Sequence, residues 1–230
     1  MIVDPISSKA TIVGCIGGNI DPKPSGSLRI SSINPGDIQL QDIKITLQHV
    51  IDQQIDIQCF SEVNLDTNKN HIQHTIQQTV MKMGNKGRSP WGSSKIPAVE
   101  SYKPGGTGIA SFGDHAGRIK AIEKYPYGRW SYHIPDGKNN IDVLIISVYQ
   151  CCARPTTKIG GTAFHQQQIQ FIDEGREELD PRGEIQMIYS CLSKRRFLQT
   201  QTASHFFWVI GMKNAKATLH LTSYVNDLGW

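Results

Sequence analysis

A strand–helix–strand pattern near the start of the chain limits what it can fold into. Residues 28–34, LRISSIN, alternate apolar and polar side chains as a half-buried strand does. Residues 39–53 repeat apolar side chains every three or four positions, which is typical of an amphipathic helix, and residues 55–62, IDIQCFSE, are apolar almost to their end. Two strands joined in this way run toward the same edge of a sheet. The pattern therefore predicts that Asn34 and Glu62 lie close together.

The rest of the chain favours a sheet sandwich with helices outside it. Residues 71–83 have helical periodicity, and a further helix is expected over 162–178. Between them, short β-branched and aromatic runs such as GGTGIASF and IDVLIISVYQ alternate with turn sequences, which predicts a strand meander. FFWVIG, residues 206–211, is expected to be the last strand.

Length and composition favour a single ordered domain over residues 27–230. The first 26 residues include GGNIDPKPSGS and are predicted to form a flexible leader. Without a basic segment ahead of a sustained apolar core, the amino terminus does not predict a signal peptide, and no apolar run approaches the roughly 18 residues of a membrane span. The five cysteines form no CxxC pair, which favours a reducing compartment. We expect an intracellular protein, cytoplasmic or nuclear, without a membrane partner.

The charge of the chain permits an anionic partner. The 24 basic and 20 acidic residues give a net charge of +4 and an isoelectric point near 8.8. This mild excess is compatible with binding to nucleic acid, although it does not require it.

In their order and spacing, LRISSIN, IDIQCFSE, GGTGIAS, GRW and LIISVYQ resemble the endonuclease/exonuclease/phosphatase family, particularly the endonuclease domains of non-LTR retrotransposons. The resemblance implies an α/β fold, a four-layer α/β sandwich. It also implies that Glu62 is a metal ligand, that Asn34 acts in catalysis and metal binding, and that Tyr149 is an active-site residue. The DPR segment, 180–182, is similar to one that often lies on the helix before the next catalytic strand.

The expected activity is hydrolysis of a phosphodiester in DNA, assisted by Mg²⁺ or Mn²⁺. A hard divalent ion takes oxygen ligands and neutralises charge on the phosphoryl oxygens. Glu62 would supply the carboxylate, Asn34 would help to hold the ion or its water, and Tyr149 would donate a hydrogen bond to the phosphate or contact the cleaved strand. With one carboxylate, we expect the ion to be held weakly.

The chain departs from the family near its end. The family places Asp-x-Asn after the last strand, where the Asp orients or activates the attacking water and the Asn contacts the phosphate. Here the stretch is VIGMKNAK, so Asn214 matches and is implied to be catalytic, while Met212 stands where the Asp belongs. A thioether neither accepts a proton at neutral pH nor binds Mg²⁺ usefully. The family's closing Ser-Asp-His segment is also absent, which predicts a domain that lacks its final strands and is weakly active or inactive. If the chain is active, Asp227 and His205 are the first alternative bases.

Two other functions stay open: a non-catalytic module that binds nucleic acid or another partner, and a phosphatase of small or lipid phosphates. The residues themselves also have simpler interpretations. Asn34 precedes a turn sequence, a Glu at a strand end is often only solvated, and Tyr149 could be a half-buried aromatic. His71 and His74 are expected on a solvated helix face, SKRRFLQ on the surface, and Trp91 and Trp130 in a core or interface.

Overall fold

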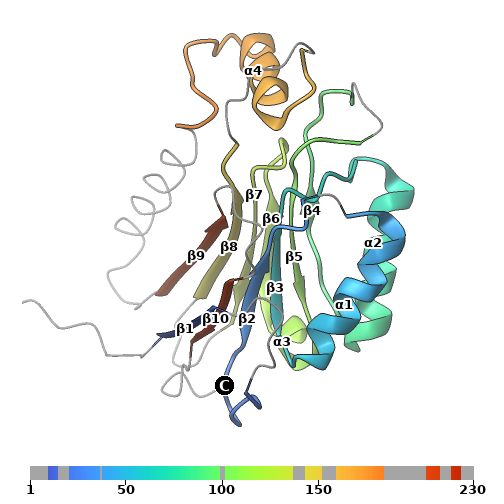
Figure 1. Ribbon diagram of the computed structural model, residues 1–230, viewed down its shortest axis with the longest axis vertical. Helices are drawn as coiled ribbons and strands as arrows, with labels where there is room; N and C mark the ends of the chain where they lie inside the picture. Colours follow the sequence, from blue (N-terminus) through green and yellow to red (C-terminus); the bar gives the residue numbers. More distant parts are fainter. Residues whose placement is uncertain are drawn as a thin grey trace, which may run out of the picture.

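In a computed structural model of the protein, the described residues are 10–14, 21–36, 38–98, 102–136, 143–151, 159–183, 206–212 and 219–223. For 10–14, 143, 206–212 and 219–223 the description covers the backbone alone. Two β-sheets pack face to face, and helices lie outside them (Figure 1). The predicted α/β class, with helices outside a sheet sandwich, is confirmed.

The first sheet contains the predicted strand–helix–strand unit. Its six strands lie in the order β1-β10-β2-β3-β5-β4. Their bounds are Ala10–Gly14 (β1), Leu219–Ser223 (β10), Ile30–Ile33 (β2), Ile57–Ser61 (β3), Thr107–Ser111 (β5) and Trp91–Gly92 (β4). β2 and β3 are parallel, with Ile33 beside Phe60 at their carboxyl ends. These two strands therefore end at one edge of the sheet.

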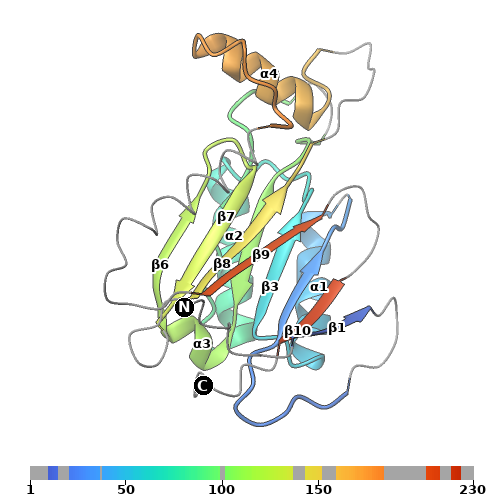
Figure 2. The ribbon, with the colours of Figure 1, turned by 90° about the vertical axis from the view of Figure 1, so that its left-hand side faces the viewer.

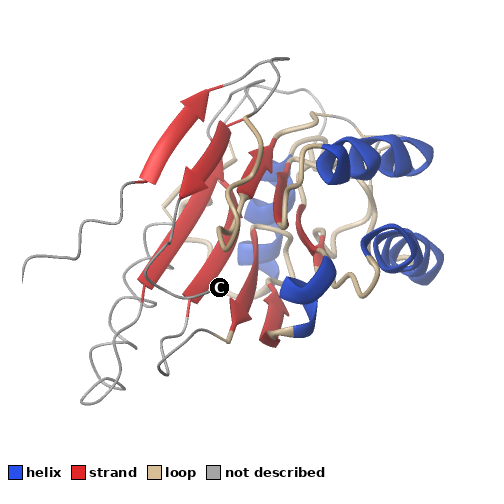
Figure 3. Ribbon diagram, turned by 90° about the horizontal axis from the view of Figure 1, so that it is seen from below, coloured by secondary structure: helices blue, strands red, loops and turns tan. Residues whose placement is uncertain are grey.

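Two helices cover the outer face of this sheet (Figures 1 and 3). A short 3₁₀ turn, η1 (Leu40–Asp42), leads into α1 (Ile43–Asp52), and α2 (Asn70–Gly84) follows β3. Their apolar stripes and the sheet enclose the main hydrophobic core, where the rings of Phe60 and Trp91 lie 4.8 Å apart. The apolar periodicity of both helices is thus explained by burial against one sheet face.

The second sheet packs against the other face of the first sheet (Figure 2). Several polar side-chain contacts join the two sheets. A short helix, α3 (Gly113–Gly117), precedes its first strand in the chain. The strands of this sheet lie in the order β6 (Ile119–Lys124), β7 (Trp130–Pro135), β8 (Val143–Tyr149) and β9 (Phe206–Met212). The hydroxyls of Thr107 and Ser131 lie 3.0 Å apart, and the Ser147 hydroxyl donates to the Phe60 carbonyl at 2.8 Å. These buried hydrogen bonds hold β5 against β7 and β3 against β8.

The last described helix, α4 (Ala163–Asp173), lies over one end of the sandwich (Figures 1 and 2). It is shorter than the predicted 162–178. Its chain reverses after Glu174 because Gly175 has a φ of 66° and Arg176 donates its backbone N–H to the Phe171 carbonyl at 2.7 Å. The DPR segment lies in an exposed turn beyond this helix, where Arg182 pairs with Asp180 at 2.6 Å.

Several expectations need correction. The region expected as a leader contains β1, which pairs with β10, so residues 10–14 belong to the sheet. FFWVIG is not the last strand, because β10 follows β9 and inserts between β1 and β2. One of the turn sequences expected between the strands of the meander, GDHAG at residues 113–117, forms a short helix instead. SKRRFLQ lies outside the described residues, and none of the described helices is long and apolar enough to cross a membrane.

Candidate active site

Asn34 and Glu62 meet at the carboxyl edge of β2 and β3. Each residue directly follows its strand, and the Asn34 amide nitrogen Nδ2 donates a hydrogen bond to Glu62 Oε2 at 2.8 Å. Both side chains are partly exposed. The proximity predicted from the two parallel strands is confirmed, and the result is a carboxylate held in place by an amide at an accessible edge.

Asn64, which sequence reasoning missed, ties this edge together. The side-chain oxygen Oδ1 of Asn64 accepts the backbone N–H of Gly105 at 2.8 Å, and its side-chain nitrogen Nδ2 donates to the Gly36 carbonyl. Gly36 in turn donates its N–H to Asn34 Oδ1 at 2.9 Å. One buried side chain thereby fixes the loops that follow β2 and β3 and the loop that precedes β5.

The backbone after β3 is strained. Glu62 and Asn64 both have a φ of 56°, a left-handed conformation that L residues other than Asn and Asp rarely adopt. Such conformations persist when the surroundings hold them, and they are concentrated at functional sites. Here the strain accompanies the turn that directs Glu62 toward Asn34.

Tyr149 lies at the same end of the sandwich but does not touch the Asn34–Glu62 pair through any described contact. It ends β8, is 9% exposed, and donates its backbone N–H to the Arg129 carbonyl at 2.9 Å. A Cβ placed on Gly105 would lie 3.3 Å from its ring, and Gly105 is the residue bonded to Asn64. The loop containing Gly105 thus lies between Tyr149 and the other two residues.

The remaining predicted residues are placed only in part. β8 and β9 are parallel, and their register sets the backbone of Met212 beside Tyr149. Met212 therefore lies at the strand end where the resemblance expects an Asp, although its side chain is not described. Asn214, His205 and Asp227 fall outside the described residues.

A buried lysine also borders this end. Lys103 is 3% exposed and donates its backbone N–H to the backbone carbonyl of Asn64 at 3.2 Å. Its ammonium group donates to the backbone carbonyl of Ile96. Burial lowers the pKa of Lys103, and the negative charge of Asp66 partly opposes that effect. No sequence motif singled this residue out.

The donors at this end fit a weakly held Mg²⁺. Within the described part of the chain, no group of three or more His, Cys, Asp or Glu side chains could enclose a metal ion. Mg²⁺ does not need such a cage, because it keeps several waters and binds through one or two carboxylates together with substrate phosphate. Glu62 supplies one such carboxylate, and the Asn34 amide oxygen is a possible neutral ligand that also accepts the Gly36 N–H.

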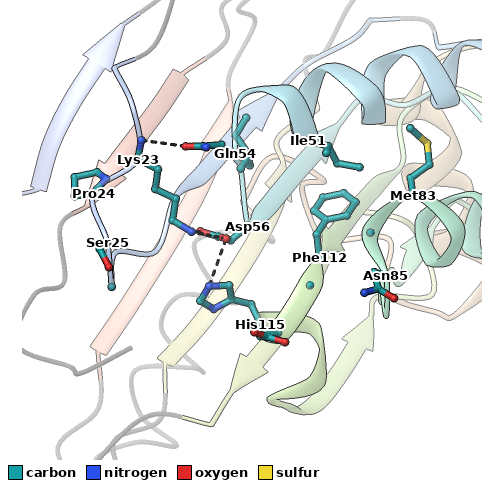
Figure 4. A pocket seen from close by; sticks show the side chains of 15 residues that line it. Lys23, Pro24, Ser25, Ile51, Gln54, Asp56, Met83, Asn85, Phe112 and His115 are labelled. Atoms are coloured by element: carbon teal, nitrogen blue, oxygen red, sulfur yellow. Dashed lines mark hydrogen bonds and ion pairs between the residues drawn. The ribbon is translucent and has the colours of Figure 1, made fainter.

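A second feature, a cavity of about 590 Å³, lies at the opposite end of the sandwich (Figure 4). There Asp56, which precedes β3, accepts from Lys23 Nζ at 2.6 Å and from the Arg29 backbone N–H at 2.7 Å, and His115 Nε2 lies 3.4 Å away. Burial lowers the pKa of His115, and the charge of Asp56 opposes this. Since these bonds use the Asp56 carboxylate to hold the segment before β2, we interpret the cluster as structural.

Comparison with known proteins gives matches among solved structures alone. No family model and no curated protein matches the chain. The chain is similar to an endonuclease/exonuclease/phosphatase family protein from Leptotrichia buccalis, with 16% identity and a TM-score of 0.44 over 80% of this chain and 66% of that one. It is also similar to the AP endonuclease LMAP from Leishmania major, with 10% identity and a TM-score of 0.42 over 61% and 46%.

A third similar structure is truncated Caenorhabditis elegans TDP2, with 14% identity and a TM-score of 0.43 over 80% of this chain and 61% of that one. The chain spans less than two thirds of the length of each of the three structures. The first of them belongs by its description to the family that the sequence motifs resemble. At such low identity, the roles of individual residues have to be argued from their own geometry.

Proposed function

We propose that the chain is a phosphodiester hydrolase acting on DNA, of the retroelement endonuclease type, with its site at the carboxyl edge of β2 and β3. The observation that carries this proposal is the hydrogen bond between Asn34 and Glu62 at the ends of two parallel strands. Tyr149 at the same end of the sandwich supports it, as does the mild positive charge of the chain.

Each residue of the site has a separate proposed role. Glu62 would hold Mg²⁺ or Mn²⁺, and the Asn34 amide fixes the orientation of its carboxylate. When bound, the ion would neutralise phosphoryl charge and help to supply a nucleophilic water. Tyr149 would contact the phosphate or the cleaved strand, and Asn214 would contact the phosphate.

Met212 favours a second candidate function, a non-catalytic nucleic-acid-binding module. Its backbone lies beside that of Tyr149, where a side-chain carboxylate could orient the attacking water, and methionine cannot do this. A positioned acid–base group contributes about 10² to 10⁴ in rate. We therefore expect the natural chain to be a poor catalyst even if it binds DNA.

Nicking of supercoiled plasmid in Mg²⁺ tests the proposal. The wild type should nick little, and Met212→Asp should nick measurably faster, in a way that chelator and an added Glu62→Gln substitution abolish. Met81→Asp is the matched control, because Met81 is 47% exposed on α2 and should not change the rate. Robust, chelator-sensitive nicking by the wild type would contradict the assigned role of position 212. Equal rates for the two Asp variants, with plasmid binding retained, would favour the binding module.

A further inference from the structure

Two arginines among the described residues are buried in the sandwich, and they differ in their hydrogen-bond partners. Arg29, at the end near the cavity, is 3% exposed, and its guanidinium donates to the carbonyls of Gln53 and Asp21 at 2.6 Å each. Arg129, at the end near Tyr149, is 1% exposed, yet none of its three guanidinium nitrogens donates a hydrogen bond to any residue that the structure describes.

An unsatisfied buried guanidinium is unfavourable for folding. Removing a charge from water is compensated only when hydrogen-bond acceptors or an opposite charge replace the water. The ring of Tyr149 supplies part of that compensation, since the central guanidinium carbon lies 5.0 Å from the ring centroid. A ring face cannot accept the five N–H groups of the guanidinium, so most of its hydrogen-bonding capacity remains unused.

The unused donors lie at the end that holds the candidate site. Arg129 directly precedes β7, and its carbonyl accepts the N–H of Tyr149. The hydroxyl of Ser61, the residue before Glu62, is also buried and has no hydrogen-bond partner in the described part of the chain. The helix α4 covers this end in Figure 1, and its residues Gln166, Gln167 and Gln170 carry further buried polar atoms that bond to none of the residues that the structure describes. Unpaired polar groups thus gather around the carboxyl edge of the sheets.

We propose that Arg129 binds the phosphate of the substrate, as a phosphate or phosphodiester subsite beneath Tyr149. This inference rests on the proposed function of the same site. A planar guanidinium offers parallel N–H groups that match two oxygens of one phosphate, and such charge-assisted bonds are strong. The anion would approach from the edge where Asn34 and Glu62 are partly exposed, at the same end of the sandwich as Arg129.

Thermal unfolding with and without inorganic phosphate, at matched ionic strength in chloride, tests this role without metal or turnover. Phosphate should raise the melting temperature of the wild type, because a ligand that binds only the folded state stabilises it. Arg129→Met should be at least as stable as the wild type without phosphate, since it replaces an unsatisfied buried charge by an apolar side chain of similar length. Its affinity for phosphate should fall by about ten- to a hundredfold, as for lost hydrogen bonds to a charged group.

Arg29→Met is the matched control. It should lower the melting temperature, because it leaves two carbonyls without their donor, and it should retain the full phosphate effect. The inference is overturned if phosphate does not stabilise the wild type, or if Arg129→Met loses stability as Arg29→Met does and still responds to phosphate. Should Arg129→Met not fold, Arg129→Lys keeps the charge and should retain a weaker response, and an unchanged response would also overturn the inference.

The two proposals can fail separately. Loss of the phosphate effect as predicted, together with no nicking by Met212→Asp, would leave a phosphate-binding site without catalysis. Nicking that depends on Glu62, together with phosphate binding that does not depend on Arg129, would remove the arginine from the site and leave the proposed hydrolase intact.

Discussion

At the scale of single residues, the site is built on a strained turn. Glu62 and Asn64 both adopt left-handed backbone conformations, which cost about 1–2 kcal/mol for an L residue such as Glu62 and less for Asn64. Glycine would relieve the strain at either position, but it would remove the carboxylate that accepts from Asn34 or the amide that joins three loops. Stability and site geometry are therefore in conflict at these residues.

Comparing Glu62→Gly with Glu62→Ala isolates the strain, since both variants lose the side chain and its hydrogen bond. The glycine variant should be the more stable by about 1 kcal/mol, because glycine adopts positive φ without a Cβ clash. Urea unfolding at neutral pH measures the difference. If the alanine variant proves equally or more stable, position 62 does not hold the left-handed conformation in solution.

Some residues of the candidate site could be predicted from the sequence, and others could not. Asn34 and Glu62 could be predicted to meet because both follow parallel strands of one unit, and their meeting needs only local topology. Asn64, Lys103 and Arg129 could not, because their contacts join loops far apart in the sequence, and burial of a polar side chain leaves no periodic signal. Asn64 lies two residues beyond the predicted strand end at Glu62, and the tolerance of Asn for positive φ was the available hint.

At the scale of elements, close packing between β4 and β5 depends on Gly108. A Cβ at this position would lie 2.5 Å from a ring carbon of Trp91, which is fully buried and packs against the tilted ring of Phe60. Neither ring has room to move, because both belong to the main core.

Gly108→Ala should therefore lower the free energy of unfolding by about 1–3 kcal/mol, the usual effect of overpacking a core. Gly117→Ala is the control, since a Cβ there meets nothing within 4 Å and this glycine lies in α3. It should be neutral or slightly stabilising. Chemical unfolding of both variants provides the measurement, and equal stabilities would mean that Trp91 can move away from β5.

The periodicity of apolar residues predicted most helices and strands. It missed a short strand whose partners lie far away in the sequence, and it misjudged the end of a helix. α1, α2 and β3 were predicted because each buries a regular apolar stripe or run. β10 was missed although Leu219 and Leu221 alternate, because five residues are a weak signal and its partners lie near the other end of the chain. The end of α4 was misjudged because a glycine cap, and not a change of polarity, stops it.

At the scale of the whole molecule, the interface between the two sheets is more polar than the sequence indicated. His133 lies there, fully buried, with Nδ1 2.6 Å from the Ser111 hydroxyl. Burial, aided by the charge of Arg88, lowers the pKa of His133 from 6.5 to about 3. The folded protein thus holds this imidazole neutral, whereas the unfolded chain would protonate it near pH 6.5.

Stability should consequently fall as the pH drops from about 6.5 toward 3, because the unfolded state binds the additional proton. One such group contributes a slope of at most about 1.4 kcal/mol per pH unit. His133→Gln should flatten the dependence of the unfolding free energy on pH in this range, leaving the part due to His115, whose pKa is also lowered by burial. His71→Gln on the exposed side of α2 is the control. An unchanged slope for His133→Gln would place His133 in contact with water.

The central claim is that the edge formed by β2 and β3 is a divalent-ion site organised by Glu62. Titration calorimetry with Mg²⁺ and Mn²⁺ on the wild type and on Glu62→Gln tests it most directly, because it requires neither substrate nor turnover. We expect weak binding by the wild type, as for one carboxylate with a largely hydrated ion, and its loss in the variant. Equal affinities for the two proteins, or no binding by either, would contradict the claim.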